Sequence, residues 1–325
     1  MEHMPAFTVH RPTSVEDAVR LRSADKRSRY VAGGTDMVVN VRRGIEQPTS
    51  LIDLGAIAGM HDIVEYADGW RIGAAVTLAA LGKHVDIART HLAVSQAARA
   101  VAGPTHQSYG TVGGNLCLDT RCLFYNQSEW WRRSNDYCLK RNGTVCHVAP
   151  GGKQCFAAFS GDLAPAMLVH DAEVELVAPE GTRRIPLARL YNDDGMNHLA
   201  LRPGELLVAV HLPRIKGNAR SGYLKARVRG SIDFPLAGVA VRIRMNGDIV
   251  DTLKIALTGV SPYPHVVEGI ADFVGKTLDA AALDRLREIV RKEAKPMRTT
   301  TVKPWYRRRV VGALARRLVE SLAAG

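Results

Sequence analysis

A glycine pair between a short apolar strand and a helix restricts what the first fifty residues of this chain can fold into. Residues 30–32 predict the strand, Gly33-Gly34-Thr35-Asp36 the turn and residues 37–43 the helix, which Asp36 could cap and Gly44 would end. Residues 50–54 predict a second strand, so the segment favours a compact β-turn-α-β unit. Because glycine has no Cβ atom, backbone N–H groups of the turn can approach a ligand closely. A turn that opens a helix is typical of phosphate binding, although a plain turn would have the same pattern.

A second glycine pair occurs in the segment Thr111-Val112-Gly113-Gly114-Asn115. Two such turns in one chain fit the pyrophosphate of a dinucleotide, with Asn115 able to hydrogen-bond backbone or ligand. Neither turn has the G-x-G-x-x-G spacing, so a Rossmann fold is not supported.

The length of 325 residues indicates two or three domains. No apolar run approaches the roughly 20 residues of a membrane helix, and the N-terminal segment lacks a basic start followed by an apolar core. We therefore expect no membrane span, no secretory signal and a cytoplasmic location, where thiols stay reduced and disulfides are disfavoured.

The formal net charge of +12 raises the question of a nucleic-acid partner. The basic residues are spread along the chain and no nucleic-acid-binding motif is present, so we expect no such partner. The densest basic run, residues 303–317, is typical of a solvated or subunit-facing helix. The other interpretation is a basic face that docks an acidic electron carrier.

The pattern of apolar residues divides the chain into three parts. The first is residues 1–54, and the second, residues 55–216, has strand patterns at 61–66, 70–74, 160–177 and 205–213 with helical spacing between them. In the third part, residues 217–325, three strands with a turn at Asn246-Gly247-Asp248 precede two helices. This order predicts an α+β fold with a separate C-terminal α+β domain.

Four of the five cysteines, Cys122, Cys138, Cys146 and Cys155, lie in an insert at about residues 117–158. Their local concentration suggests a metal site, but the spacing matches neither a zinc finger nor a ferredoxin. Structural zinc, a disulfide and His147 as a replacement ligand remain alternatives. We expect Cys117 to be a buried residue of the second glycine loop and not a ligand.

Four segments, taken together and in order, are more specific for one family than either glycine pair alone: YVAGGTDM, TVGGNL, SGDLAPAML and LKARVRGSIDFPLAGVAV. Together they resemble the FAD-binding medium subunit of the molybdenum hydroxylase (xanthine oxidase) family over nearly the whole chain. The resemblance implies a two-part FAD-binding domain of the vanillyl-alcohol-oxidase type, made of residues 1–54 and 55–216, with FAD between the parts. It also implies a C-terminal domain with a three-stranded antiparallel sheet and helices.

The resemblance implies which residues lie at FAD. The first loop would cradle the pyrophosphate, the second would surround it, Asp162 would bind the adenosine portion or its loop, and Lys225 would lie near the flavin ring and stabilise its anionic reduced form. The full implied set is Tyr30, Val31, Ala32, Gly33, Gly34, Thr35, Asp36, Met37, Val101, Thr111, Val112, Gly113, Gly114, Asn115, Asp162, Leu206 and Lys225.

The insert departs from the family's usual pattern, in which only a few residues separate the two flanking motifs. It resembles the additional iron–sulfur loop of the branch of the family that reduces 4-hydroxybenzoyl-CoA. That implies a 4Fe–4S cluster on Cys122, Cys138, Cys146 and Cys155.

Since the chain has no pattern for substrate chemistry, we interpret it as an electron-transfer subunit. The resemblance implies a large molybdenum-cofactor subunit and a small subunit with two 2Fe–2S clusters as partners, in a dimer of heterotrimers. Reduced ferredoxin would then drive the dehydroxylation of 4-hydroxybenzoyl-CoA to benzoyl-CoA. One alternative is an outward-running hydroxylase or dehydrogenase of another aromatic or purine substrate, and another is a non-enzymatic zinc-binding scaffold.

Overall fold

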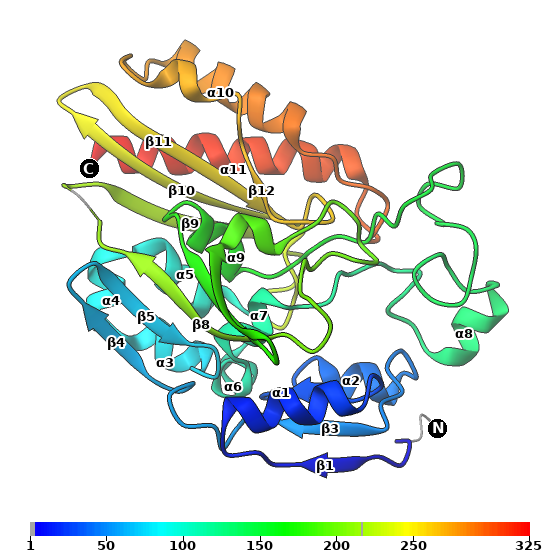
Figure 1. Cartoon of the computed structure of the whole chain (residues 1–325). Coiled ribbons are helices and arrows are strands. Elements are labelled where there is room, and N and C mark those ends of the chain that lie inside the picture. The colour runs from blue at the N-terminus through cyan, green and yellow to red at the C-terminus, as the bar shows by residue number, and fades with distance from the viewer. Residues whose placement is uncertain (1–3, 216) are drawn as a thin grey trace.

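The computed structural model describes residues 4–215 and 217–325, which form three β-sheets with helices around them. Figure 1 shows the N-terminal sheet at one end, the C-terminal sheet at the other and the second sheet between them. The predicted boundary at residue 216 lies outside the described residues. The mixed helix and strand composition and the antiparallel C-terminal sheet confirm the predicted fold class.

The N-terminal sheet is parallel, in the order β1-β3-β2. Its elements are β1 (Thr8–His10), α1 (Val15–Ala24), β2 (Arg29–Val31), α2 (Met37–Arg42) and β3 (Ser50–Asp53). These are the strand, turn, helix and strand that the first glycine pair predicts. Gly44 follows α2 with a φ of +66°, a left-handed conformation that ends a helix readily only at glycine.

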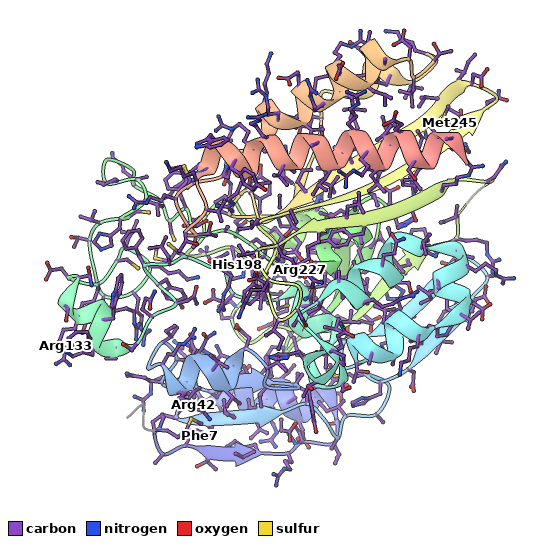
Figure 2. All side chains as sticks on the ribbon, turned by 180° about the vertical axis from the view of Figure 1, so that it is seen from behind. Phe7, Arg42, Arg133, His198, Arg227 and Met245 are labelled. Carbon is purple, nitrogen blue, oxygen red and sulfur yellow. The ribbon has the colours of Figure 1, made fainter. Side chains whose placement is uncertain are left out.

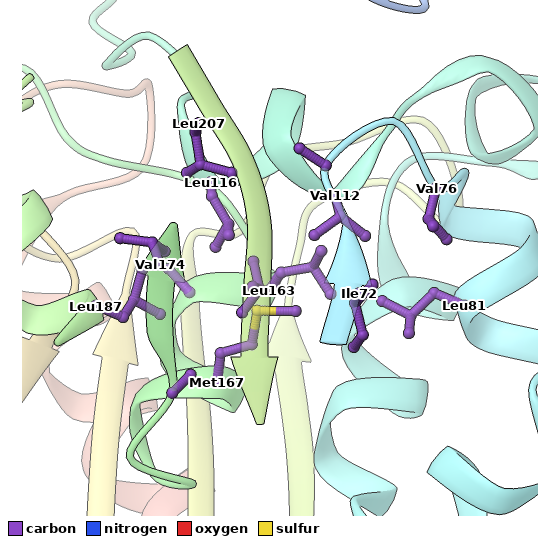
Figure 3. Close-up of a cluster of buried hydrophobic side chains, with 14 of the residues drawn as sticks. Ile72, Val76, Leu81, Val112, Leu116, Leu163, Met167, Val174, Leu187 and Leu207 are labelled. Carbon is purple, nitrogen blue, oxygen red and sulfur yellow. The ribbon is translucent and has the colours of Figure 1, made fainter. Parts of the chain in front are cut away.

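The second sheet is antiparallel, in the order β4-β5-β8-β6-β7. Its strands are β4 (Ile63–Tyr66), β5 (Gly69–Gly73), β6 (Glu173–Ala178), β7 (Gly181–Pro186) and β8 (Leu206–Pro213). The helices are α3 (Leu78–Lys83), α4 (Val85–Thr90), α5 (Leu92–Ala100), α6 (Pro104–Tyr109), α7 (Val112–Leu116) and α9 (Leu163–Leu168), with a 3₁₀ turn at Leu187–Leu190. Side chains from α7, α9, β5, β6 and β8 meet in one core, where Val112, Leu163 and Met167 lie together (Figure 3).

The segment of residues 160–177 differs from the sequence prediction. The strand pattern expected over residues 160–177 is wrong for its first half, because Leu163–Leu168 is the helix α9 and only β6 is a strand. All six residues of α9 are buried, so no polar face shows its helical period in the sequence.

The C-terminal sheet is antiparallel, in the order β12-β11-β10-β9. It consists of β9 (Arg220–Ala226), β10 (Ala237–Asn246), β11 (Ile249–Thr258) and β12 (His265–Val266), followed by a 3₁₀ turn (Ala271–Phe273), α10 (Ala280–Glu293) and α11 (Pro304–Ala324). The fourth strand, β12, has only two residues and was not predicted. Along β10, Val239 and Val241 face the core under α10 and α11, whereas Ala240 faces the core of the second sheet. The C-terminal sheet therefore joins two hydrophobic cores.

The insert extends beyond the sheets and contains one helix, α8 (Glu129–Ser134) (Figure 1). Its base is closed by Arg121 and Ala158, whose backbone groups exchange hydrogen bonds of 2.7 and 2.8 Å. The Arg132 guanidinium, which is 1% exposed, donates to the carbonyl of Arg43 at 3.0 Å. In the part of the chain that the structure describes, no helix is long and apolar enough to cross a membrane.

Candidate functional site

A cavity of about 490 Å³ lies where the first glycine loop faces the second sheet. It is lined by all eight residues of the first loop (Tyr30, Val31, Ala32, Gly33, Gly34, Thr35, Asp36, Met37) and by Val101, Thr111, Gly113, Gly114, Asn115, Asp162 and Leu206. Fifteen of the seventeen predicted FAD-site residues, all but Val112 and Lys225, therefore line one cavity, although they come from segments far apart in the sequence. Such a volume is typical of a small-molecule site.

The four loop glycines have different physical roles. A Cβ atom at Gly33 would lie 1.7 Å from the carbonyl oxygen of Tyr109, so this glycine lets the first loop touch the second part of the fold. Gly34 has a φ of +70°, which a side chain rarely allows, and a Cβ at Gly113 would lie 2.8 Å from Ala74. At Gly114 only the Thr111 hydroxyl lies within 4 Å of a Cβ position. Gly114 lines the cavity, so this loop leaves backbone accessible to a ligand, which fits a pyrophosphate cradle.

Asp36 does not cap α2, contrary to the sequence expectation. Its carboxylate accepts hydrogen bonds from Arg121 at 2.7 Å and from the Asn40 amide at 3.0 Å. Burial raises the pKa of Asp36, and the Arg121 guanidinium opposes that rise. Arg121 belongs to the insert, so this ion pair joins the insert to the first glycine loop inside the cavity wall.

Asp162 and Lys225 form a buried ion pair of 3.0 Å, with their side chains 3% and 4% exposed. Tyr223 also donates to Asp162, at 2.6 Å, and Lys225 donates to the carbonyl of Ala100 at 3.0 Å. Burial raises the pKa of Asp162, while Lys225 opposes the rise. Asp162 reaches the cavity but Lys225 lies behind it, so the predicted contact of Lys225 with a flavin ring stays a prediction.

Some of the remaining predicted residues line the cavity, and others are buried behind it. Val101 and Leu206 line the cavity, whereas Val112 is fully buried in the core (Figure 3). Asn115 accepts from the backbone N–H of Leu163 at 2.9 Å and so fixes the start of α9. Several further lining residues were not predicted from the sequence: Asp119, Arg121, Ser160, Arg229, Ile232 and Phe234. The sequence signal for these residues is only that they lie in the insert or in the two segments SGDLAPAML and LKARVRGSIDFPLAGVAV.

The four insert cysteines line a second, small cavity together with Phe124, Tyr125, Lys140 and His147. These four cysteines carry free thiols. Cys117 is also a free thiol, but it lines the first cavity. Burial raises the pKa of Cys122 to about 11 and that of Cys155 to about 12. A metal bound here would have to displace protons from these thiols.

Two residues connect the cavities. Asp119 lines the first and Lys140 the second, and the Lys140 ammonium donates to the Asp119 carboxylate at 2.5 Å. Burial alone would raise the pKa of Asp119. The Lys140 ammonium beside the carboxylate outweighs this effect, so the pKa of Asp119 is lowered. This ion pair therefore links a residue of the first cavity to a residue of the second.

A cavity between two glycine loops, next to an α+β C-terminal unit, is the arrangement that the sequence predicts for a flavin-binding subunit. Residues 5–215 match the family described as the FAD binding domain in molybdopterin dehydrogenase, and residues 222–322 match the CO dehydrogenase flavoprotein C-terminal domain. The chain therefore belongs to the FAD-binding medium subunits of the molybdenum hydroxylase family, and it is a subunit of an oxidoreductase.

Individual relatives agree with this assignment. The aldehyde oxidoreductase FAD-binding subunit PaoB of Escherichia coli is 35% identical over 281 residues, which cover 82% of this chain and 85% of the relative. The carbon monoxide dehydrogenase medium chain of Afipia carboxidovorans is 27% identical and covers 98% of this chain and 97% of its own length. A solved structure of reconstituted CO dehydrogenase from Oligotropha carboxidovorans matches with a TM-score of 0.82 at 26% identity, over 99% of both chains.

Proposed function

We propose that this chain is an electron-transfer subunit that holds FAD in the first cavity and a 4Fe–4S cluster on Cys122, Cys138, Cys146 and Cys155. The observation that carries the proposal is the convergence of these four thiols, separated by up to 33 positions in the sequence, on one small cavity beside the FAD site. Four thiolates are the full ligand set of one cubane cluster.

The placement of the thiols favours a cluster over a single ion. Tetrahedral zinc, with Zn–S bonds of about 2.3 Å, draws its four ligands close together. Among residues 4–215 and 217–325, no three His, Cys, Asp or Glu side chains are grouped closely enough to hold one metal ion. A cubane spreads its thiolates over four irons and so suits the wider arrangement.

The two groups have complementary chemistry when bound. FAD exchanges electrons singly or in pairs, whereas a 4Fe–4S cluster carries one at a time. The chain's own residues bind and separate these groups. We infer that substrate chemistry takes place on a large molybdenum-cofactor subunit, that a small subunit with two 2Fe–2S clusters connects it to this chain, and that two such heterotrimers associate.

The relatives favour an outward-running enzyme, in which electrons leave the substrate and pass to an acceptor. PaoB is part of an aldehyde oxidoreductase, and the nicotine 6-hydroxylase medium subunit of Paenarthrobacter nicotinovorans is 34% identical over 256 residues. Both relatives belong to enzymes that act on organic compounds, and hydroxylation is an oxidation. We therefore propose an aldehyde or an aromatic compound as the substrate class.

A second candidate is the inward-running dehydroxylation of 4-hydroxybenzoyl-CoA with reduced ferredoxin. It rests on the length and cysteines of the insert. The assembled enzyme should be assayed with aromatic aldehydes and a one-electron acceptor, and separately with 4-hydroxybenzoyl-CoA and reduced ferredoxin. Turnover only in the second assay would reject the outward-running proposal.

The cofactor proposal is tested by replacing single cysteines with serine in the purified complex. We expect Cys138→Ser and Cys146→Ser to lose most iron and acid-labile sulfide attributable to this subunit while FAD is retained. Cys117→Ser is the matched control, because Cys117 lines the FAD cavity and not the cysteine cavity. Equal iron in all three variants, or about one zinc per chain, would reject the cluster.

A further inference from the structure

Lys140, which lines the cysteine cavity, forms an ion pair with Asp119, which lines the FAD cavity. We infer that this pair is the electrostatic bridge between the two cofactor sites, and that the Lys140 cation raises the reduction potential of the cluster. The inference rests on the proposed function, since it needs a cluster on the four cysteines.

The geometry fixes the cation in place. The Lys140 side chain is 6% exposed, and its ammonium donates to the Asp119 carboxylate at 2.5 Å and to the Thr120 hydroxyl at 2.6 Å. It also lies 4.3 Å from the ring centre of Tyr125, which lines the cysteine cavity and hydrogen-bonds Asp119. A lysine held by a carboxylate, a hydroxyl and an aromatic face has little freedom to turn away.

The position of the charge decides its effect. Of the described residues that line the cysteine cavity, Lys140 is the only lysine or arginine, and the ring Nε2 of His147 is engaged with the carbonyl of Tyr137. Adding one electron adds one negative charge to a site with four thiolates. A buried cation beside it stabilises that charge more strongly than a solvated cation would, because the surroundings are less polarisable than water.

Asp119 has the opposite effect at the FAD cavity. Asp119 lines the FAD cavity and Lys140 the cysteine cavity, so the pair forms a dipole with its positive end toward the cysteine site and its negative end toward the flavin site. This dipole favours an electron at the cysteine site over one in the FAD cavity. The same arrangement would make electron transfer from flavin to cluster more downhill, in agreement with an outward-running enzyme.

The test is a redox titration of the purified complex, followed by electron paramagnetic resonance, with iron and FAD content measured on each sample. We expect Lys140→Met to weaken the electron affinity of the cluster at least tenfold, which is about 59 mV for a one-electron couple. Lys140→Arg keeps the charge and should restore most of the wild-type potential. Asp119→Asn leaves the cation without its partner and should shift the cluster potential in the positive direction.

Lys254→Met is the matched control. Lys254 lies on β11 of the C-terminal sheet and also pairs with an aspartate, Asp171, but neither residue lines the FAD cavity or the cysteine cavity. If Lys140→Met retains no iron, the sign of the Asp119→Asn shift decides the question. Potentials equal to wild type in every loaded variant would overturn the inference while leaving the cluster itself established. Wild-type complex without a cluster on this subunit would instead reject the proposed function.

Discussion

Gly33 shows at the scale of one residue why a loop glycine can serve the fold as well as the ligand. The sequence suggested close approach of backbone to a phosphate, and the structure adds a contact between the two parts of the FAD site. That contact leaves no room for a side chain, because a Cβ atom would lie far closer to the Tyr109 carbonyl oxygen than van der Waals contact allows.

We expect Gly33→Ala to lower the free energy of unfolding by about 3 kcal/mol and to reduce FAD content, since the first loop must move away from the second. The comparison is Gly151→Ala, where nothing lies within 4 Å of the new Cβ atom. Flavin released per chain and a denaturant titration measure the two effects. A Gly33→Ala protein with full FAD and wild-type stability would contradict the structural explanation.

His198 gives a pH dependence at the same scale. Burial lowers its pKa from 6.5 to about 4, and its ring Nε2 is bonded to the carbonyl of Leu118 at 3.0 Å. Between pH 6.5 and 4 the unfolded chain therefore binds a proton at this position and the folded chain does not. Stability is present above pH 6.5 and falls as the pH drops, by at most about 3 kcal/mol.

The measurement compares denaturant titrations of wild type and His198→Gln at several pH values between neutral and mildly acidic. The stability difference between the two proteins should shrink or reverse as the pH falls, because only wild type carries this protonation penalty. A difference that is constant with pH would exclude His198 as its source.

At the scale of elements, α11 is tied to the rest of the chain by a buried arginine. Arg307 donates to the carbonyl of Leu236 at 2.9 Å, to that of Met297 at 2.9 Å and to that of Gly259. The segment it holds continues to the insert, because the Thr299 carbonyl accepts from the backbone N–H of Leu123 at 2.9 Å. The basic helix, which the sequence predicts as solvated or subunit-facing, therefore also helps to position the cysteine site.

We expect Arg307→Met to lower the free energy of unfolding by about 3 kcal/mol or more, since several buried acceptors lose their donor. Arg308→Met is the control, because the neighbouring side chain is exposed. Calorimetry or denaturant titration would report the difference. Equal losses in both variants would mean that general charge reduction, and not the buried hydrogen bonds, matters.

Elements with a local signal could be predicted from the sequence, and elements set by distant contacts could not. Gly44, in the unit from β2 to β3, and Gly247, in the turn between β10 and β11, have φ angles of +66° and +58°. Because these angles favour glycine, the residue type itself indicates the end of the helix and the turn. In contrast, the helix α9 is buried on all sides, and Asp36 turns to Arg121, which lies 85 positions away. Lys225 likewise matched a motif, but its direction depends on Asp162 in another element.

At the scale of the whole molecule, the insert is an extension beside the FAD cavity and lies at the edge of the fold (Figure 1). Of its charged side chains, Arg133, Lys153 and Asp136 are exposed whereas Arg132 and Lys140 are buried, and Trp130 on α8 is 75% exposed. Arg133 lies at the outer edge of the molecule (Figure 2). Exposed cations and an exposed aromatic residue beside the proposed cluster site suit the docking of an acidic electron-carrier protein such as a ferredoxin.

We therefore expect electron exchange between the assembled enzyme and an acidic ferredoxin to slow roughly tenfold from low salt to about 0.5 M salt, because ions screen the attraction that guides encounter. Arg133→Glu should slow the exchange at low salt and reduce its salt dependence, with little change at high salt. Lys83→Glu makes the same charge change on α3, far from the insert, and should have a much smaller effect. Stopped-flow kinetics over a range of salt concentrations would measure all three proteins. Identical salt dependence in the two variants would place the docking surface elsewhere, because only a charge near the site of encounter alters its local potential.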